Sequence, residues 1–348
     1  MNMNIPDCPI PTQPNDCITL AHGGGGRMTG RLIETLFYPA FANRWLEQAH
    51  DGATLTVPAP RIAFSTDSFV VSPLFFPGGS IGDLAVNGTV NDLLCCGAKP
   101  LYLSAAFILE EGLPLDTLRQ VVQAMHRAAA HAGVSIVTGD TKVVEHGKCD
   151  GLYINTSGIG VVPGNIEIGL HRVKKGDAVI VTGPIGNHGV SVLSTREGLG
   201  FETSVQSDTA ALTQIVSNLL AGVPDVHMLR DPTRGGLSST LNEIAEEAGV
   251  TITLDKEALP IEAPVQAACN LLGLDPLYVA NEGIMLVFLP DEYAEQALHI
   301  IRNDPHGSKA SLIGHVTDDR HPEVLLQLAL GQTRVIDMLS GEQLPRIC

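Results

Sequence analysis

The sequence predicts an α+β protein of two domains. Its 348 residues are more than one hydrophobic core usually supports. Segments typical of strands and of helices alternate in both halves, but without the regular count of a doubly wound sheet. A change of composition at residues 163–165 places the boundary there. We therefore divide the chain into a flexible leader (1–17), an N-terminal domain (18–164), a C-terminal α/β domain (165–335) and a mobile tail (336–348).

The N-terminal domain is predicted to contain three helices and four strands. The first helix, 31–47, has apolar residues near helical spacing, but Pro39 should interrupt it. Gly97 and Pro100 end the second helix, and Gly133 ends the third. The other predicted helices are 82–96 and 115–132, and the strands are 61–67, 101–109, 134–138 and 152–162.

The C-terminal domain is predicted to begin with a strand at 177–181. A glycine-punctuated turn, Gly183 to Gly189, follows it and is read as an ordinary tight turn. Helices are predicted at 209–221, 232–248 and 292–301. Further strands are predicted at 250–254, 285–289 and near 311–316 and 333–338.

Composition excludes several classes of protein. The formal net charge of −17 argues against a nucleic-acid or anionic-membrane surface. The seven cysteines show no CxxC pair and no zinc-ligand spacing. We see no signal peptide at the N-terminus and no apolar stretch of the roughly 18–20 residues that a membrane span needs. A cytoplasmic protein is expected.

Aspartates in loops and at element ends are the first candidate site. Asp67 and Asp140 each follow an apolar strand, Asp83 opens the helix 82–96, and Asp231 precedes Pro232 as the N-cap of 232–248. Clustered carboxylates repel one another unless a cation joins them, and oxygen ligands suit Mg²⁺. Each aspartate also has a plain structural role as an alternative, a helix cap in the case of Asp83 and Asp231.

A polar stripe runs along the helix 82–96. Asp83, Asn87 and Asn91 are four residues apart, so they share one face, and Asp92 lies on its shoulder. On a helix otherwise rich in Leu, Val and Ala, the stripe is either a solvated face or the wall of a polar site. Both interpretations stay open.

Three further features could carry phosphate or proton chemistry. The run His22-Gly-Gly-Gly-Gly26-Arg27 could wrap an anion with its backbone N–H groups or could be a hinge. Lys142 follows Gly-Asp-Thr and could reach a terminal phosphate, or it could be an ordinary surface lysine. Glu282 precedes an apolar strand, where a raised pKa would suit a base, although a surface turn is an equal alternative.

The last residue, Cys348, is a thiol tethered on one side only. It could enter a pocket and leave it, or it could be an accidental free thiol at a frayed end. The cation of Arg346 favours the nucleophilic thiolate, and the terminal carboxylate opposes it.

Together these segments resemble the HypE family of hydrogenase-maturation factors, in the PurM-like superfamily named for aminoimidazole ribonucleotide synthetase. The resemblance spans nearly the whole chain. The segments that carry it are HGGGGR (22–27), STDSFVV (65–71), the Asn91-Asp92 helix, GDTKVV (139–144), VTGPIGNHG (181–189), RDPTRGGL (230–237), ANEG (280–283) and PRIC (345–348).

This resemblance implies a two-domain PurM-like fold in a homodimer. The N-terminal domains, which would bind ATP, would pair their sheets across the dimer into a barrel. ATP and Mg²⁺ are the implied cofactors. The implied metal ligands are Asp67, Asp92, Asp140 and Asp231, and the implied nucleotide contacts are Asp83 and the turn Gly139-Asp140-Thr141, with Asp67 and Asp92.

The resemblance also implies a reaction. The carbamoyltransferase HypF would load a carbamoyl group onto Cys348, and the S-carboxamide would be dehydrated with ATP to a thiocyanate. Phosphorylation turns the amide oxygen into a good leaving group, Lys142 stabilises the phosphoryl charge, and Glu282 is the first candidate base. The tail would then deliver cyanide for the iron of [NiFe]-hydrogenase to a HypC–HypD complex.

Two other functions compete with this one. A selenophosphate synthetase, from the same superfamily, carries a reactive Cys or selenocysteine and a Lys in its glycine-rich loop, and the loop here has neither. A non-catalytic carrier, whose tail shuttles a group while a partner does the chemistry, would need Cys348 but not the aspartates or Lys142.

Overall fold

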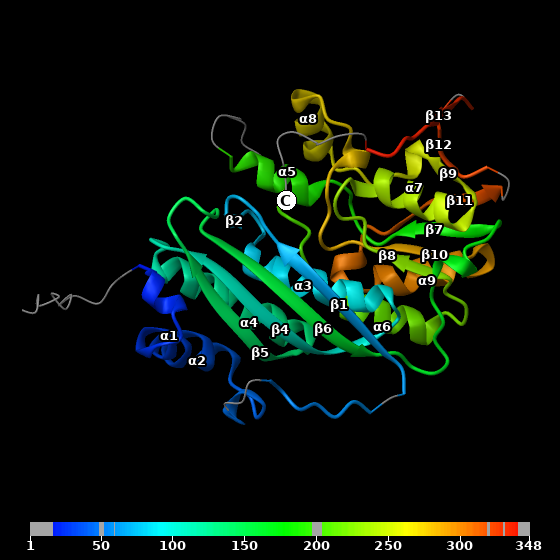
Figure 1. The fold of residues 1–348 in the computed structure, drawn as a ribbon. Coiled ribbons are helices and arrows are strands. Elements are labelled where there is room, and N and C mark those ends of the chain that lie inside the picture. The colour runs from blue at the N-terminus through cyan, green and yellow to red at the C-terminus, as the bar shows by residue number, and fades with distance from the viewer. Residues whose placement is uncertain are drawn as a thin grey trace, which may run out of the picture.

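The computed structural model describes residues 17–48, 52–58, 60–196, 204–318, 321–329 and 331–339. Most of the predicted leader and most of the predicted tail, including Cys348, lie outside these residues. The described chain forms two large sheets with helices packed around them, and a small two-stranded sheet of β2 (Phe75–Phe76) and β3 (Gly79–Ser80) (Figure 1).

The N-terminal half is a four-stranded sheet in the order β1-β6-β4-β5. Its strands are β1 (Ile62–Phe69), β4 (Lys99–Glu110), β5 (Ser135–Val144) and β6 (Leu152–Val161). Strand β6 pairs antiparallel with β1 and β4, and β5 pairs parallel with β4. Helices α3 (Ile81–Cys95) and α4 (Leu115–Ala132) cover one face, and Figure 1 looks onto the other.

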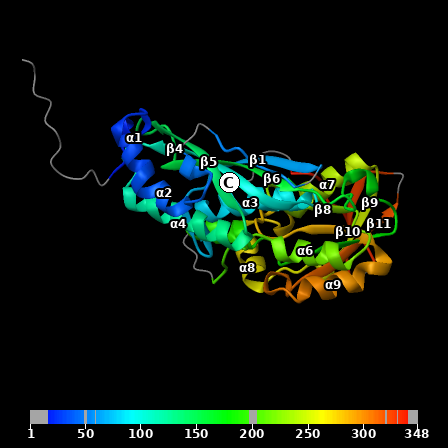
Figure 2. The same ribbon diagram turned by 90° about the horizontal axis from the view of Figure 1, so that it is seen from below.

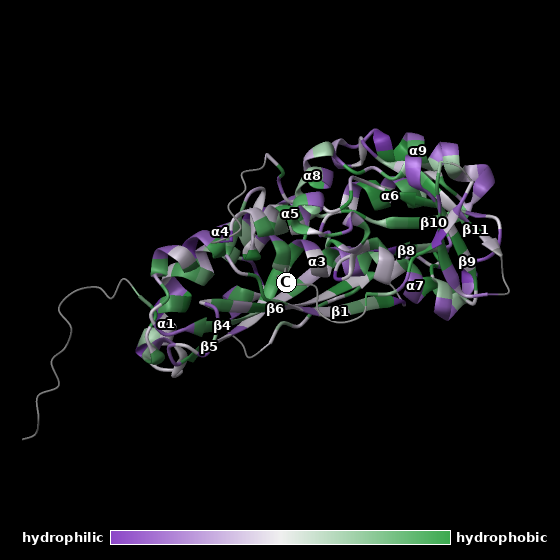
Figure 3. Ribbon diagram, turned by 90° about the horizontal axis from the view of Figure 1, so that it is seen from above, coloured by the Kyte–Doolittle hydropathy of each residue, from purple (hydrophilic) through white to green (hydrophobic). Residues whose placement is uncertain are grey.

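The C-terminal half is a seven-stranded sheet in the order β13-β12-β9-β11-β7-β10-β8. Helix α7 (Gly236–Ala248) covers one face, and α6 (Thr213–Gly222) and α9 (Ala294–Arg302) cover the other (Figure 2). Figure 3 shows the hydrophobic character of β10 within this sandwich. The strands are β7 (Asp177–Val181), β8 (Met228–Arg230), β9 (Thr251–Asp255), β10 (Leu286–Pro290), β11 (Ser311–Asp318), β12 (Glu323–Gln327) and β13 (Thr333–Val335).

One hydrophobic cluster crosses from one half to the other. It includes Val90 of α3 and Met125 of α4 as well as Ile215 of α6 and Ala297 of α9, all buried. Side chains of β7 alternate between this cluster and a second one under α7, as a strand buried on both faces requires. The two halves are therefore packed together through apolar contacts rather than joined only by the connecting chain.

Most predicted elements are present, and several boundaries are corrected. The predicted helix 31–47 is instead α1 (Arg27–Leu32), a π-helical turn (Ile33–Phe37) and α2 (Tyr38–Phe41). Pro39 lies in the first turn of α2, directly after the π-helical turn, and the helical run ends at Phe41. Helices α5 (Asn187–Ser194) and α8 (Ala263–Leu272) and strands β8 and β12 had no counterpart among the predicted elements.

Candidate active site

Four acidic side chains lie near one another where the two halves of the chain pack together. Asp67 projects from β1, Asp92 from α3, Asp231 follows β8, and Glu282 precedes β10. They are close enough that the charges of Asp67, Asp92 and Asp231 all raise the pKa of the Glu282 carboxyl. We call these four residues the acidic cluster. The sequence predicted each of them as a site residue but could not show that they come together.

Burial is the main cause of the unusual acidity of this cluster. It raises the pKa of Asp92 to about 6, with the Asp231 charge adding to the rise and the Ser65 hydroxyl opposing it. Ser65 Oγ donates to Asp92 Oδ2 at 2.6 Å. Burial also raises the pKa of Asp231, and it lifts that of Glu282 well above the ordinary range. Binding of a cation at such a site is therefore electrostatically favourable.

The oxygen donors of the cluster fit Mg²⁺ chemically. Among the described residues, however, no three acidic, histidine or cysteine side chains are placed to hold one ion. A divalent cation would therefore take one or two of these carboxylates and complete its coordination with waters and substrate phosphates, as Mg²⁺ commonly does.

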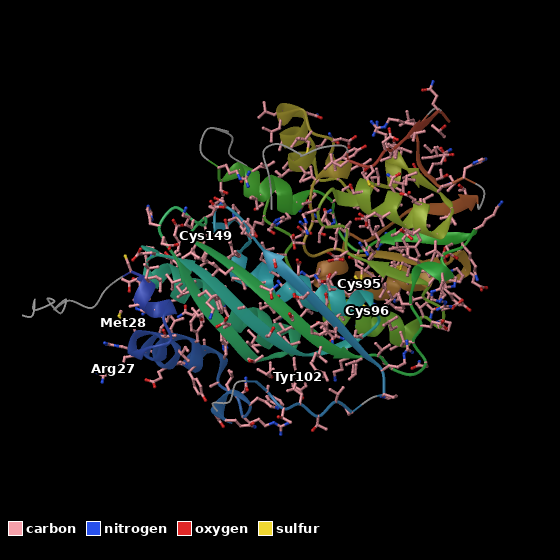
Figure 4. All side chains as sticks on the ribbon, viewed as in Figure 1. Arg27, Met28, Cys95, Cys96, Tyr102 and Cys149 are labelled. Carbon is pink, nitrogen blue, oxygen red and sulfur yellow. The ribbon has the colours of Figure 1, made fainter. Side chains whose placement is uncertain are left out.

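Two thiols lie at the edge of the acidic cluster. Cys95 and Cys96 stand at the end of α3 (Figure 4), and Cys95 Sγ donates to Asp231 Oδ1 at 3.6 Å. Burial, with the charges of Asp231 and Asp92, raises the pKa of Cys95 well above its ordinary value. This thiol therefore stays protonated and serves as a hydrogen-bond donor.

Asp231 is not the helix cap that the sequence predicted. Helix α7 begins only at Gly236, and its N-cap is Gly235. Both glycines have positive φ, +75° and +60°, so the chain turns sharply there instead of continuing the helix back to Pro232. Asn281 Nδ2 donates to the Pro232 carbonyl at 2.8 Å and ties this turn to the chain beside Glu282. The turn leaves the Asp231 carboxylate free to face the cluster.

Asp140 and Lys142 lie elsewhere, on the open face of the N-terminal sheet. They were predicted just after a strand, but β5 continues to Val144, because it pairs with β4 along its whole length. Asp67 likewise lies within β1 rather than at its end. Lys142 Nζ is 3.3 Å from an Asp140 carboxylate oxygen, and the two side chains are 66% and 63% exposed.

Registers show how far apart the two regions are. Asp67 pairs with Thr156, Thr156 with Ala105, and Ala105 with Gly139. Gly139 is thus three strands from Asp67, or roughly 14 Å at the usual strand spacing. Asp140, the next residue, points to the opposite face of the sheet. Within one chain, the structure does not bring Asp140 together with the other predicted metal ligands.

The glycine run packs against this same strand. It overlaps the short helix Leu20–Gly23, in which His22 is buried, and a Cβ on Gly23 would lie 2.6 Å from the Val143 backbone nitrogen. Beside it, a pocket of about 430 Å³ is lined by five aromatic side chains and by Gly139, Asp140 and Thr141; the aromatic residues are Phe37, Tyr38, Phe41, Trp45 and Phe107. Two distant glycine-containing motifs therefore meet at one strand.

The polar stripe on α3 is buried, so the solvated-face alternative is wrong. Asn91 is 1% exposed; its Nδ2 donates to the Ala210 carbonyl at 2.9 Å, and its Oδ1 accepts from Leu212 N at 3.0 Å. Asn87 Nδ2 donates to Thr209 Oγ1 at 3.2 Å. Asp83 lies in the first turn, where Ser80 Oγ donates to it at 2.7 Å. Asn87 and Asn91 of the stripe therefore hold residues 209–212 of the other half.

The chain matches two family models. Residues 49–162 match the N-terminal domain of AIR synthase related proteins, and residues 174–327 match the C-terminal domain. Carbamoyl dehydratase HypE of Azotobacter vinelandii is 52% identical over 334 residues, which cover 96% of this chain and 98% of the relative. The protein of the same name from Cupriavidus necator is 53% identical over 332 residues, 95% of each chain.

Solved structures agree with this. A hydrogenase maturation protein HypE in complex with ATP superposes with a TM-score of 0.90 at 49% identity, covering 94% of this chain and 99% of that one. The matching chain of a HypE–HypF complex has a TM-score of 0.78 at 45% identity, covering 88% and 99%.

Proposed function

The chain belongs to the HypE family of AIR synthase related proteins, and from that premise we propose that it dehydrates an S-carboxamide on its own C-terminal cysteine with ATP. The product would be a thiocyanate that supplies cyanide ligands for the iron of [NiFe]-hydrogenase. The observation that carries the proposal is 52% identity to a carbamoyl dehydratase over nearly the whole of both chains. The residue Cys348 and the buried acidic cluster support it.

Glu282 is suited to the role of base. The amide N–H groups of a carbamoyl thioester are weak acids, and a carboxylate whose proton affinity is raised by burial accepts their protons more readily than an ordinary one. Burial and four neighbouring carboxylates raise the pKa of Glu282, with Asp208 the largest of the charges. The substrate, tethered to the chain through Cys348, would react at high effective concentration.

The cluster would hold the metal ion. Asp67, Asp92 and Asp231 are the proposed ligands, and Mg²⁺ there would neutralise charge on the transferring phosphoryl group. The γ-phosphate would go to the amide oxygen, which then leaves as phosphate. Asp83, at the start of α3, and the β5 residues Gly139, Asp140 and Thr141 are the proposed nucleotide contacts. The aromatic pocket beside this part of β5 is suited to an adenine ring.

The open face of the N-terminal sheet supports the proposed homodimer. Ile62, Phe64 and Ile108 are 55%, 66% and 43% exposed on it. Large apolar side chains exposed on a sheet face are typical of a surface that another subunit covers. We propose that two copies pair their sheets here into a barrel. Asp140 and Lys142 lie on this face and would be available to the second subunit as a metal ligand and a phosphate contact.

Partners and compartment follow from the same reaction. We propose that HypF loads the carbamoyl group and that a HypC–HypD complex accepts the cyanide. A free Cys348 needs a reducing compartment, which supports the cytoplasm. Within the described residues, no helix is long and apolar enough to cross a membrane.

The deciding experiment is the mass of the C-terminal peptide after incubation with HypF, carbamoyl phosphate and ATP. We expect carbamoylation of Cys348 and then loss of one water only when ATP is present. If the carbamoylated peptide loses water equally well without ATP, the enzyme proposal is wrong. The carrier alternative predicts that Asp92→Asn and Lys142→Ala leave ATP turnover unchanged, whereas we expect both to reduce it.

A further inference from the structure

Asp208, which the sequence analysis did not single out, lies against the backbone of Glu282. It belongs to a segment, residues 204–212, that runs between the two halves just before α6. We propose that Asp208 is a positioning residue, which fixes the backbone from which Glu282 projects and so serves the dehydration without touching the substrate. This inference rests on the proposed function of Glu282.

One oxygen of the Asp208 carboxylate accepts two backbone hydrogen bonds. Asp208 Oδ2 accepts from Glu282 N at 3.0 Å and from Gly283 N at 2.9 Å. Hydrogen bonds to a carboxylate are roughly twice as strong as neutral ones. On the other side, the Asp208 carbonyl packs on Gly283 so closely that a Cβ there would lie 1.7 Å from the oxygen. Two consecutive residues are therefore held by one carboxylate.

The segment that carries Asp208 is itself fixed from both halves. Ser207 N donates to the Pro77 carbonyl at 2.8 Å, and the Asn91 amide binds Ala210 and Leu212. From the other half, His188 Nδ1 lies 2.9 Å from Ser207 Oγ. Asn91 Nδ2 also lies 3.4 Å from the Glu282 carbonyl. The backbone of Glu282 is thus gripped at its N–H by Asp208 and at its C=O by α3.

The positioning role needs an acceptor oxygen at this position rather than a negative charge. An asparagine oxygen could accept the same two N–H bonds without the cost of burying a second charge beside Glu282. Burial raises the pKa of Asp208, and its charge raises that of Glu282.

The test compares Asp208→Ala with Asp208→Asn in the full-length protein. Two readouts are needed: amide hydrogen exchange of residues 280–284, and the rate of water loss from the carbamoylated C-terminal peptide. We expect Asp208→Ala to lose protection at Glu282 and Gly283, and to lower kcat by about a hundredfold with KM for ATP unchanged. Asp208→Asn keeps an acceptor, so it should retain protection and restore kcat to within about fivefold of the wild type.

Asp255→Ala is the matched control, because it removes a carboxylate that accepts a backbone N–H (from Glu257, at 3.0 Å) at the end of β9. It should change neither readout. Lost protection with unchanged kcat in Asp208→Ala would reduce Asp208 to a structural role, and retained protection would contradict the geometry. If Asp208→Ala does not fold, Asp208→Asn decides: full protection with a hundredfold lower kcat overturns the proposal. Failure of the wild type to dehydrate would overturn the proposed function instead, while exchange still tests the positioning.

Discussion

The acidic cluster and the Asp140–Lys142 pair contain the same kinds of side chain in opposite environments. The cluster is walled by α3 and by the second sheet, and burial raises the pKa of all four of its carboxyls. Asp140 and Lys142 belong to the same N-terminal sheet as Asp67, but they stand in solvent on its other face. The surroundings of a carboxylate, rather than its sequence motif, decide whether its pKa is raised and whether binding of a cation relieves its electrostatic cost.

Glu282→Gln, in the acidic cluster, should cause the largest loss of activity. The amide keeps the size of the side chain but cannot accept a proton, so we expect the rate of water loss from carbamoylated Cys348 to fall by roughly 10²–10⁴-fold. Carbamoylation by HypF should continue, which makes it the internal control. A rate within a factor of three of the wild type would remove Glu282 from the mechanism.

Asp92→Asn should stabilise the ligand-free protein at neutral pH. The folded pKa of about 6 lies above the ordinary 3.8, so the folded state binds the proton more tightly than the unfolded state does. Stability from this group is present below the unfolded pKa and is lost as pH rises through the folded one, at most about 3 kcal/mol.

The measurement is urea unfolding of Asp92→Asn and wild type at pH 8 and pH 4. The variant should gain stability at pH 8, and the gain should shrink at pH 4. Asp140→Asn is the control from the exposed region and should show no gain at either pH. Equal effects of the two substitutions would contradict the contrast between the regions.

Phe64→Glu tests whether a second subunit covers the open face of the N-terminal sheet. A charge in place of this exposed ring should leave the monomer fold intact but should weaken the proposed dimer by about 2 kcal/mol per subunit, since a buried aromatic contact is lost. Sedimentation across a concentration series measures the effect. Thr66→Glu, on the same strand and face, helps separate the apolar contact from added charge. No change in either variant would mean that this face does not form the interface.

Lys142→Ala should have the smallest effect on stability. Exposed ion pairs contribute little, so the free energy of unfolding should change by less than about 0.5 kcal/mol. ATP turnover should nevertheless fall about tenfold or more if Lys142 contacts a phosphate. Unchanged turnover would leave the pair as surface charge only.

Local pattern predicted the elements better than it predicted the site. Helix α4 and strand β7 have the predicted ends, because a C-terminal glycine and an uninterrupted apolar run determine them. Helix α6 begins four residues later than predicted, at Thr213, because Asn91 of α3 holds Ala210 and Leu212 outside the helix. That contact spans about 120 residues and leaves no local signal.

The same limit applies to the candidate site. Asp67, Asp92, Asp231 and Glu282 were each predicted from their flanking residues, and the structure places them together. Asp208 was missed because its partner, the backbone of Glu282, lies 74 residues away in a loop with no sequence motif of its own. Asp140 was grouped with the others because the sequence does not show which face of a sheet a residue takes once the strand runs past it.

The apolar cluster shared by both halves limits how substrates can come and go. Separating the two halves would move side chains of α3 and α4 away from those of α6 and expose them to water. We therefore expect the body to stay closed through a catalytic cycle. Nucleotide and substrate would then have to enter and leave without any separation of the two halves.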